Sequence, residues 1–446
     1  MGKELFGTDG IRGVAGEYPL DPATIYAFGV ALGHDITKSH SSPEVLIGAD
    51  TRESGPWIAE LVAGGLESCG ARVRYAGVIT TPGVAYLTRT GPFRAGVMIS
   101  ASHNPYRDNG IKVFSQSGFK LPDAEEHAIE QDIFQVVQDS RPVCARPVFV
   151  DVALDRQYLE FLISAVSVRF DGMKLAVDCG NGASYKLAPE LFWRLGAEVT
   201  TLSASPDGRN INLNCGALHL EPLREAVVAG HADFGVAFDG DADRAIFVAR
   251  SGKIVDGDAV LLAAGRALKA AGHLAEDTVV STVMANLGLE KAFERAGIRM
   301  VRTPVGDKYV LEEMERRGAT LGGEQSGHVI FRECATTGDG MLTALRLFEI
   351  ARQAGVGLDE LTADLEVYPQ RLVNVRVREK KGLLEIPAIA EEIRRVEAVF
   401  DGAGRVLVRF SGTEPLARVM VEGSDMAQVE SFSASIAEAI RREMGA

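Results

Sequence analysis

Short apolar runs that end in glycine or a polar residue alternate with longer helical patterns up to about residue 365 of this 446-residue chain. Four clear examples are 45–48, 96–100, 175–178 and 234–238. Continuous apolar runs of this length are typical of strands buried in a mostly parallel sheet flanked by helices. The pattern therefore predicts an α/β fold, in which ligands bind at the carboxyl ends of strands.

The last segment has a different pattern. Two strands are expected at 406–410 and 418–421, and a final helix is expected because its apolar residues recur on one face. Those residues are Val429, Phe432, Ile436 and Ile440. Together with changes in composition near 146, 251 and 368, this predicts a small C-terminal α+β domain and four domains in all. Their expected bounds are 1–150, 151–254, 255–367 and 368–446.

Composition and missing motifs exclude several classes of function. The 61 acidic and 47 basic residues give a net charge of −14, which disfavours nucleic acid as a partner. We expect no membrane span and no signal peptide, because no apolar run is long enough. Five scattered cysteines favour a reducing cytoplasm. P-loop, dinucleotide, metalloprotease and nucleophile-elbow motifs are absent, which disfavours ATP-binding, hydride-transfer and lipase-type functions.

An acidic cluster follows the apolar run 234–238. Asp239, Asp241 and Asp243 alternate along the chain, so their carboxylates are expected on one side of an extended segment. Like charges this close are costly without a cation, and an all-oxygen set favours Mg²⁺. An EF-hand is excluded, because Arg244 and Arg250 stand where Gly and Glu are required. A solvated acidic turn is the simpler alternative.

A second cluster, Ser100 to Pro105, follows another apolar run. It predicts either an ordinary turn or a loop in which Ser102 is a nucleophile or phosphate carrier. His103 is adjacent to Ser102 in sequence, which is not triad geometry, so it is not assigned as the base. Downstream, Lys112 supplies a cation for a phosphate.

Two further clusters suit a phosphorylated polyol. In the glycine-rich segment 322–328, Glu324, Gln325, Ser326 and His328 resemble a polyol-binding loop. In 409–418, small and hydroxyl residues flanked by arginines suit a phosphate. Ordinary turns are the alternative for both. Taken together, the four clusters indicate phosphoryl transfer on a sugar phosphate.

The sequence resembles the α-D-phosphohexomutase family over essentially its whole length. The motifs that carry the resemblance are 6–13, the serine loop, the aspartate cluster, the glutamate loop and the C-terminal loop. The resemblance implies three similar mixed-sheet α/β domains and a smaller C-terminal α+β domain around a central cleft. It also implies that Ser102 is phosphorylated and, with Asp239, Asp241 and Asp243, binds one Mg²⁺ per subunit.

The remaining functional residues also come from the resemblance. It implies sugar contacts at Glu324 and Ser326. It implies phosphate contacts at Arg409, Ser411, Gly412, Thr413 and Arg418. Arg12, Lys112 and Arg244 are candidates to balance charge, and either His328 or Lys112 is expected to move the proton of the substrate hydroxyl.

Segments 210–216 and 282–288, together with Gln325, resemble the branch of the family that acts on glucosamine phosphates. Ala217, Leu218 and Pro304 depart from that branch. The implied reaction interconverts glucosamine 6-phosphate and glucosamine 1-phosphate through a 1,6-bisphosphate, towards UDP-N-acetylglucosamine. A hexose bisphosphate would be the activator, and a monomer or homodimer is expected. A broader glucose or mannose phosphate mutase and a non-enzymatic sugar-phosphate-binding protein are the alternatives.

Overall fold

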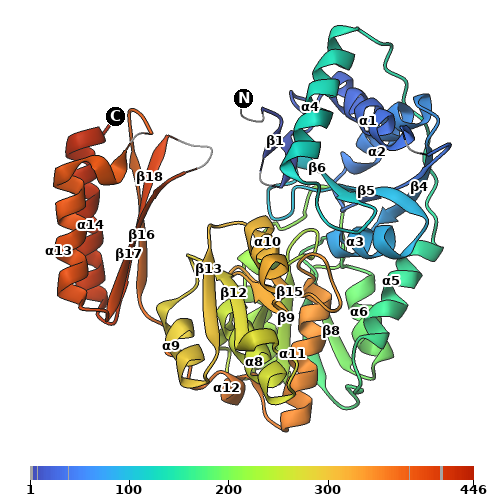
Figure 1. Ribbon diagram of the computed structural model, residues 1–446. Coiled ribbons are helices and arrows are strands. Elements are labelled where there is room, and N and C mark those ends of the chain that lie inside the picture. The colour runs from blue at the N-terminus through green and yellow to red at the C-terminus, as the bar shows by residue number, and fades with distance from the viewer. Residues whose placement is uncertain (1–3, 8, 39, 381, 412–414) are drawn as a thin grey trace. The chain divides into compact units, whose positions relative to one another are not determined.

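The computed structural model describes residues 4–7, 9–38, 40–380, 382–411 and 415–446. These residues form two compact units (Figure 1). The first unit lies within 1–282 and 303–362, and the second lies within 283–302 and 363–446. Among the described residues, no helix is both long and apolar enough to cross a membrane.

The first sheet of the first unit has six strands in the order β1-β2-β6-β5-β3-β4. Its strands are β1 (Phe6–Gly7), β2 (Gly10–Val14), β3 (Glu44–Ala49), β4 (Arg72–Val78), β5 (Phe93–Ile99) and β6 (Asp108–Ser115). Its helices are α1 (Pro22–Thr37), α2 (Gly55–Ser68), α3 (Thr81–Thr90) and α4 (Asp123–Gln138). Strand β3 pairs in parallel with β4 and β5, whereas β6 pairs antiparallel with β5 and β2.

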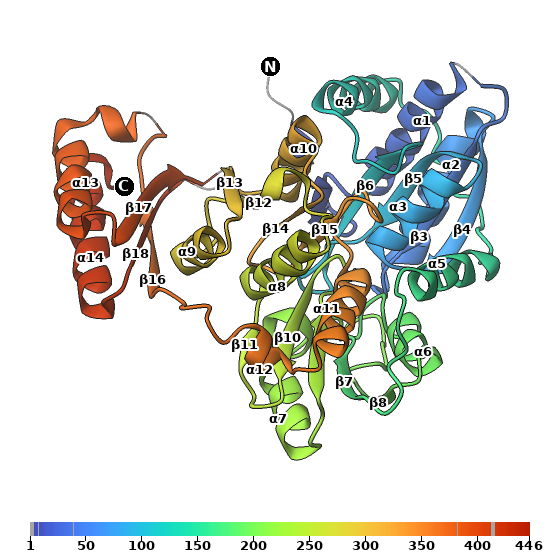
Figure 2. The same ribbon diagram turned by 60° about the horizontal axis from the view of Figure 1, so that its bottom comes forward.

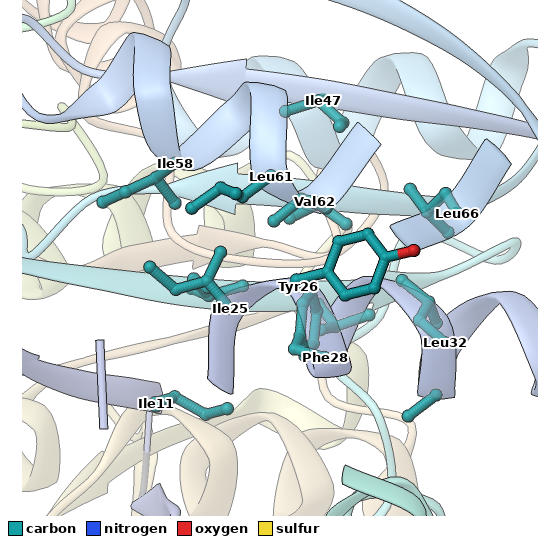
Figure 3. Close-up of a cluster of buried hydrophobic side chains, with 14 of the residues drawn as sticks. Ile11, Ile25, Tyr26, Phe28, Leu32, Ile47, Ile58, Leu61, Val62 and Leu66 are labelled. Carbon is teal, nitrogen blue, oxygen red and sulfur yellow. The ribbon is translucent and has the colours of Figure 1, made fainter. Parts of the chain in front are cut away.

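Helices α1 and α2 pack closely against each other and against one face of this sheet. A side chain on Gly29 would meet the carbonyl oxygen of Val62 at 2.4 Å, and one on Gly65 would meet that of Tyr26 at the same distance. The apolar side chains of the two helices interdigitate around this contact (Figure 3). The two glycines therefore allow a dry, close-packed layer, which gives the first sheet a rigid base.

The second sheet has the order β11-β10-β9-β7-β8. Its strands are β7 (Lys174–Asp178), β8 (Glu198–Leu202), β9 (Phe234–Phe238), β10 (Ala245–Ala249) and β11 (Ile254–Val255). The helices of this part of the chain are α5 (Ala153–Ser164), α6 (Leu187–Arg194), α7 (Glu221–Ala229) and the 3₁₀ turn Gly216–Leu218 (Figure 2). Phe348 packs against Phe234 and Phe247 with ring centroids 5.0 and 5.8 Å apart, so the helix that carries Phe348 contacts this sheet.

The third sheet contributes β12 (Thr278–Thr282), β14 (Leu321–Gly323) and β15 (Val329–Phe331) to the first unit. Its helices are α8 (Gly257–Ala270), α10 (Asp307–Arg317), α11 (Gly340–Ala354) and α12 (Leu358–Leu361), with a 3₁₀ turn at Ala275–Asp277. Helix α11 begins at Asp339, whose carboxylate accepts the backbone N–H of Leu342 at 2.9 Å. Phe348 lies on this helix.

The sheets are mixed, as the family resemblance implied, and not mostly parallel as the apolar runs alone predicted. Each contains a short loop that carries one of the predicted clusters and after which the chain turns back and pairs antiparallel. These loops are 100–107 between β5 and β6, 239–244 between β9 and β10, and 324–328 between β14 and β15. A parallel pairing needs a crossover of about a dozen residues or more, so loops this short enforce hairpins. Three of the four predicted chemical clusters occupy these three hairpin loops.

The second unit ends in the antiparallel sheet β16-β18-β17. Its strands are β16 (Gln370–Arg376), β17 (Gly404–Phe410) and β18 (Leu416–Gly423), and β13 (Arg299–Thr303) precedes the return of the chain to the first unit. Its helices are α9 (Leu287–Arg295), α13 (Pro387–Phe400), α14 (Met426–Met444) and the 3₁₀ turn Leu383–Glu385. Helix α14 buries Val429, Ile436 and Ile440. The predicted C-terminal α+β domain is thus confirmed.

Candidate active site

The serine loop and the aspartate loop are in direct contact. The hydroxyl of Ser102 donates a 2.6 Å hydrogen bond to Asp239 Oδ2, and both side chains are buried. A β-carbon on Gly240 would lie 2.4 Å from the carbonyl oxygen of Ser102. Only glycine allows the two backbones to approach this closely. The hairpin loops of the first two sheets therefore form one buried centre.

The three aspartates form a potential metal-binding group. One ligand oxygen from each of Asp239, Asp241 and Asp243 lies within 4.8 Å of the others, and all three residues are buried. The Oδ1 atoms of Asp241 and Asp243 have no hydrogen-bond partner among the described residues. Burial, together with the charges of Asp243 and Asp241, raises the pKa of Asp239 well above its ordinary value. Buried carboxylate oxygens without donors fit a hard divalent cation.

Asp241 is held in place from the first sheet. The backbone N–H of Thr81, at the start of α3, donates to the Asp241 carbonyl at 3.0 Å, and the Thr81 hydroxyl donates to Oδ2 at 2.5 Å. Lys112 Nζ donates to the same Oδ2 at 2.8 Å. These contacts occupy one carboxylate oxygen of Asp241 and leave the other for a cation.

Lys112 lies on β6 with only 1% of its surface exposed. Its Nζ is 2.9 Å from Asp9 Oδ2, 2.8 Å from Asp241 Oδ2 and 3.6 Å from Asp243 Oδ2. Burial opposes the charged form, but the carboxylates of Asp241, Asp9 and Asp243 raise the pKa of Lys112 above its ordinary value. Lys112 is therefore protonated and supplies a fixed positive charge beside the aspartates.

Two arginines approach the serine loop. Arg12 donates to the carbonyl oxygen of Ala101 at 3.3 Å and forms an ion pair with Asp9. The backbone N–H of Arg244 donates to Asp239 Oδ1 at 3.2 Å, and its guanidinium donates to His103 Nδ1 at 3.2 Å. Both arginines thus place positive charge at the end of β5, where the sequence predicted a phosphate.

His103 is nearer to the serine hydroxyl than sequence adjacency alone indicated. Its Nδ1 is 3.4 Å from Ser102 Oγ. Burial, followed by the charges of Arg244 and Arg12, lowers the pKa of His103 to about 4. His103 is therefore neutral at pH 7, and its Nδ1 accepts hydrogen bonds at the edge of the site.

The glutamate loop joins the same group through His328, which is buried. His328 Nδ1 is 3.8 Å from Asp243 Oδ1, and its Nε2 accepts the backbone N–H of Gly338 at 2.9 Å. Burial opposes its charged form, but Asp243 and Asp307 raise the pKa of His328 above its ordinary value. The three hairpin loops that carry the predicted clusters of the first unit therefore meet at the aspartates.

Glu324 and Ser326, the predicted sugar contacts, lie on this loop. Glu324 Oε1 accepts the backbone N–H of Gly306 at 3.1 Å, and the Ser326 hydroxyl is 3.4 Å from Oε2. Glu324 is buried, with 9% of its surface exposed, whereas Ser326 is exposed, so only the hydroxyl of this pair lies at an accessible edge. Gln325 turns instead to Asp256, with 3.2 Å between its Nε2 and Asp256 Oδ2.

The predicted phosphate contacts lie in the second unit. Arg409 and Arg418 are opposite each other on paired β17 and β18, and Arg418 donates to Ser411 Oγ at 3.3 Å. Burial and the charge of Arg418 lower the pKa of Arg409 below its ordinary value. Two guanidiniums this close favour a bound anion. Gly412 and Thr413 lie outside the described residues.

Several residues at the centre were not singled out from the sequence. They are Asp9, Asp50, Arg52, Thr81, Asn212 and Lys120. Asp50 and Arg52 follow the end of β3, where ligands are expected, and Asp9 lies in the resemblance motif 6–13. All three residues therefore carried a signal in the sequence. Thr81 carried none, and Asn212 belonged to the resemblance segment 210–216 but received no role, because the contacts of both depend on the way that the first two sheets pack together.

Family models match nearly the whole chain. They are described as phosphoglucomutase/phosphomannomutase α/β/α domain I at residues 3–139, domain II at 156–252, domain III at 256–368 and the C-terminal domain at 372–439. The phosphoglucosamine mutase of Solibacter usitatus is 76% identical over 447 residues, covering 100% of both chains. That of Koribacter versatilis is 52% identical, covering 99% of this chain and 98% of the relative.

The chain belongs to the phosphoglucosamine mutases of the α-D-phosphohexomutase family. It is therefore a phosphohexomutase, an enzyme of the isomerase class. The fold agrees with two solved structures. A phosphoglucomutase/phosphomannomutase family protein from Burkholderia thailandensis matches with a TM-score of 0.81 at 24% identity, covering 98% of this chain and 97% of the other. An N-acetylphosphoglucosamine mutase from Aspergillus fumigatus, in complex with GlcNAc-6P and magnesium, matches at 0.66 and 19%, covering 99% and 96%.

Proposed function

We propose that this protein interconverts glucosamine 6-phosphate and glucosamine 1-phosphate, with Ser102 as the phosphoryl carrier. One observation carries the assignment of Ser102. The hydroxyl of Ser102, the candidate nucleophile, lies 2.6 Å from Asp239, a buried aspartate of the potential metal site. A phosphoryl group on this oxygen would place its charge directly beside the aspartates, where Lys112 and Arg244 supply the opposing charge.

We assign one Mg²⁺ to Asp239, Asp241, Asp243 and an oxygen at Ser102. When bound, the ion offsets negative charge on the transferring phosphoryl group. Phosphoserine carries about −1.5 to −2 at neutral pH, and three ionised aspartates add about −3. Lys112, Arg12 and Arg244 are the residues of this chain that balance the remainder.

In the proposed reaction, the 1-hydroxyl oxygen of glucosamine 6-phosphate forms a bond to the phosphorus on Ser102. The bond from phosphorus to Ser102 Oγ breaks, and the sugar hydroxyl gives up its proton. Lys112, which is protonated, is assigned to hold charge, and His328 would take up the proton at Nε2 in place of the hydrogen bond that this atom accepts from Gly338. After the 1,6-bisphosphate reorients, its 6-phosphoryl group returns to Ser102, the oxygen at C6 takes the proton back, and glucosamine 1-phosphate is released. A hexose bisphosphate is the proposed activator.

Orientation is proposed to come from the other two clusters. Glu324 and Ser326 would hold sugar hydroxyls, while Arg409, Ser411, Gly412, Thr413 and Arg418 would hold the phosphate that does not react. A fixed non-reacting phosphate raises the rate, because the reacting oxygen is already placed when the step begins.

The other sequence-based expectations are kept as proposals. The domain bounds are 1–150, 151–254, 255–367 and 368–446. The proposed partners are sugar phosphates, and not nucleic acid or a membrane. The proposed oligomeric state is a monomer or a homodimer. A cytoplasmic location is supported by the five cysteines, all of which have free thiols.

Two measurements test the function. Initial rates on glucosamine, glucose and mannose phosphates, with Mg²⁺ and a trace of glucose 1,6-bisphosphate, should favour the amino sugar. Equal or better rates on glucose or mannose phosphate would indicate a broader mutase and direct attention to Ala217, Leu218 and Pro304.

The second measurement follows label from ³²P-bisphosphate, which should appear on Ser102. Ser102→Ala should abolish the label and lower the turnover rate by at least about 10⁴-fold, because the covalent route is lost. Normal turnover in that variant, or no label in the unmodified protein, would contradict the mechanism.

A further inference from the structure

The backbone of the serine loop is held in an unusual conformation. Ser102 has φ +52°, in the left-handed region that residues with a side chain rarely adopt. Its own N–H donates to Ser100 Oγ at 2.9 Å. A non-glycine residue in this region persists only where the surroundings over-determine it. The groups that hold the Ser102 backbone are therefore of functional interest.

Arg52 supplies the first restraint. It is 1% exposed, and its Nη2 donates to the carbonyl oxygen of Ser102 at 3.1 Å and to that of Asn104 at 2.6 Å. The other terminal nitrogen of its guanidinium pairs with Asp50, which is equally buried. A buried ion pair adds little stability by itself, so stability does not explain why Arg52 and Asp50 are buried together at this loop. A planar fork with one arm on Asp50 is suited to fix the two loop carbonyls.

Asn212 supplies the second restraint from the second sheet. Its Nδ2 lies 3.0 Å from the carbonyl oxygen of Ser102 and 3.4 Å from that of Asn104. The same two oxygens are thus bound by Arg52 from one side and by Asn212 from the other. Gly240 closes the remaining space above Ser102. Three segments, separated widely in sequence, converge on one peptide group.

We propose that Arg52, oriented by Asp50, acts with Asn212 as a clamp of positioning residues on the Ser102 backbone. The clamp keeps Ser102 Oγ directed at the aspartates. Its loss slows phosphoryl transfer and leaves the binding of sugar phosphate nearly unchanged. None of its side chains accepts the phosphoryl group. The proposal rests on the proposed role of Ser102.

Arg52→Lys is the first test, because lysine keeps the charge but cannot reach Asp50 and both carbonyls together. We expect kcat to fall by about 10–100-fold, as for a misplacement of about 1 Å, while KM changes by less than about 3-fold. The rate of ³²P transfer from bisphosphate to Ser102 should fall by the same factor. Arg209→Lys is the matched control, since Arg209 is an exposed arginine in the segment that carries Asn212, and it pairs at 2.7 Å with Glu53, the neighbour of Arg52, rather than with Ser102.

Asn212→Asp is the second variant, which is useful if Arg52→Lys does not fold. It keeps the shape but loses the donor, and kcat should again fall with little change in KM. The double variant should lose less than the product of the two single losses, because both residues act on one peptide group.

Three outcomes would overturn the clamp: normal kcat in both variants, an equal loss in Arg209→Lys, or a loss fully explained by a smaller folded fraction. Absence of label on Ser102 in the unmodified protein would instead overturn the proposed function, so the two failures are distinguishable.

Discussion

Two regions of the molecule carry charge for a phosphate, and they are built in opposite ways. The transfer centre, which comprises Ser102, Lys112 and the three aspartates, is buried, and opposite charges lie side by side. The arginine pair, Arg409 and Arg418, consists of two half-buried residues of like charge that lie opposite each other on β17 and β18. The first region thus joins carboxylates to a lysine, whereas the second places two residues of one charge on neighbouring strands.

This difference separates two tasks. A group that stabilises a transferring phosphoryl must already be oriented, since reorganisation during the step slows it. A group that only holds a phosphate gains most if its charge is poorly balanced before the ligand arrives. Changes at the transfer centre should therefore affect kcat, metal affinity and stability. Changes at the arginine pair should affect KM alone.

Among the changes that test this comparison, the largest effect is expected for Asp241→Asn. The change removes one negative ligand and weakens the partner of Lys112, so Mg²⁺ affinity should fall by at least about 10–100-fold. Calorimetric titration of Mg²⁺ measures this without reference to turnover. Asp171→Asn, in an exposed ion pair with Arg169, is the control and should bind Mg²⁺ normally. Unchanged affinity in Asp241→Asn would remove the aspartate from the metal site.

An intermediate effect is expected for Arg409→Gln. Loss of one charged donor should raise KM for the sugar phosphate by about 10–100-fold, equivalent to about 1.5–3 kcal/mol. Stability should change by no more than about 0.5 kcal/mol, and in the favourable direction, because a like charge is removed. Kinetics and thermal melting check the two parts. Arg371→Gln on β16, an exposed partner of Glu430, should alter neither. Strong destabilisation by Arg409→Gln would make the two regions alike.

The last prediction concerns pH and the framework of the first unit, away from both phosphate-binding regions. Burial raises the pKa of Asp339 to about 6, although the N–H of Leu342 and the hydroxyl of Tyr158 oppose the shift. The folded protein therefore binds the proton more tightly than the unfolded chain. The contribution is full below about pH 4, is lost as the pH rises through 6, and amounts to at most about 3 kcal/mol.

Asp339→Asn should flatten this slope in chemical unfolding measured from pH 4.5 to 7. Tyr158→Phe removes a donor at 2.6 Å from Asp339 and should steepen it. If the free-energy difference between Asp339→Asn and the unmodified protein is the same at both pH values, then Asp339 does not titrate as described.

The strands were well predicted where the apolar runs are long. The run 234–238 coincides with β9, and 175–178 lies within β7. Strand direction could not be predicted from the apolar runs, because the residues of a parallel and an antiparallel strand differ little once both faces are buried, and only the family resemblance implied mixed sheets. The shortness of loop 239–244 indicates a hairpin. Its acidic residues were interpreted only as a potential metal site.

The part of the site that local sequence patterns define could also be predicted from the sequence. Residues whose role comes from a local pattern, such as the three aspartates, were proposed correctly as a group that lies together. Arg52 and Asn212 act on a carbonyl 50 and 110 residues away in the chain. Contacts of that separation depend on how sheets pack, and no local pattern encodes them.

The hairpin loops also set an order of events during synthesis. Ser102 leaves the ribosome 137 residues before Asp239, within a hairpin that needs only its neighbouring strands. If Ser102 carries the phosphoryl group as proposed, it stays inert until the second sheet has been made and has docked. Phosphorylation would then report that the chain has been made at least as far as Asp243 and that the first two sheets have docked, since the three aspartates lie on the second sheet. The modification would serve as a mark of this docking, readable by mass spectrometry on a cell extract.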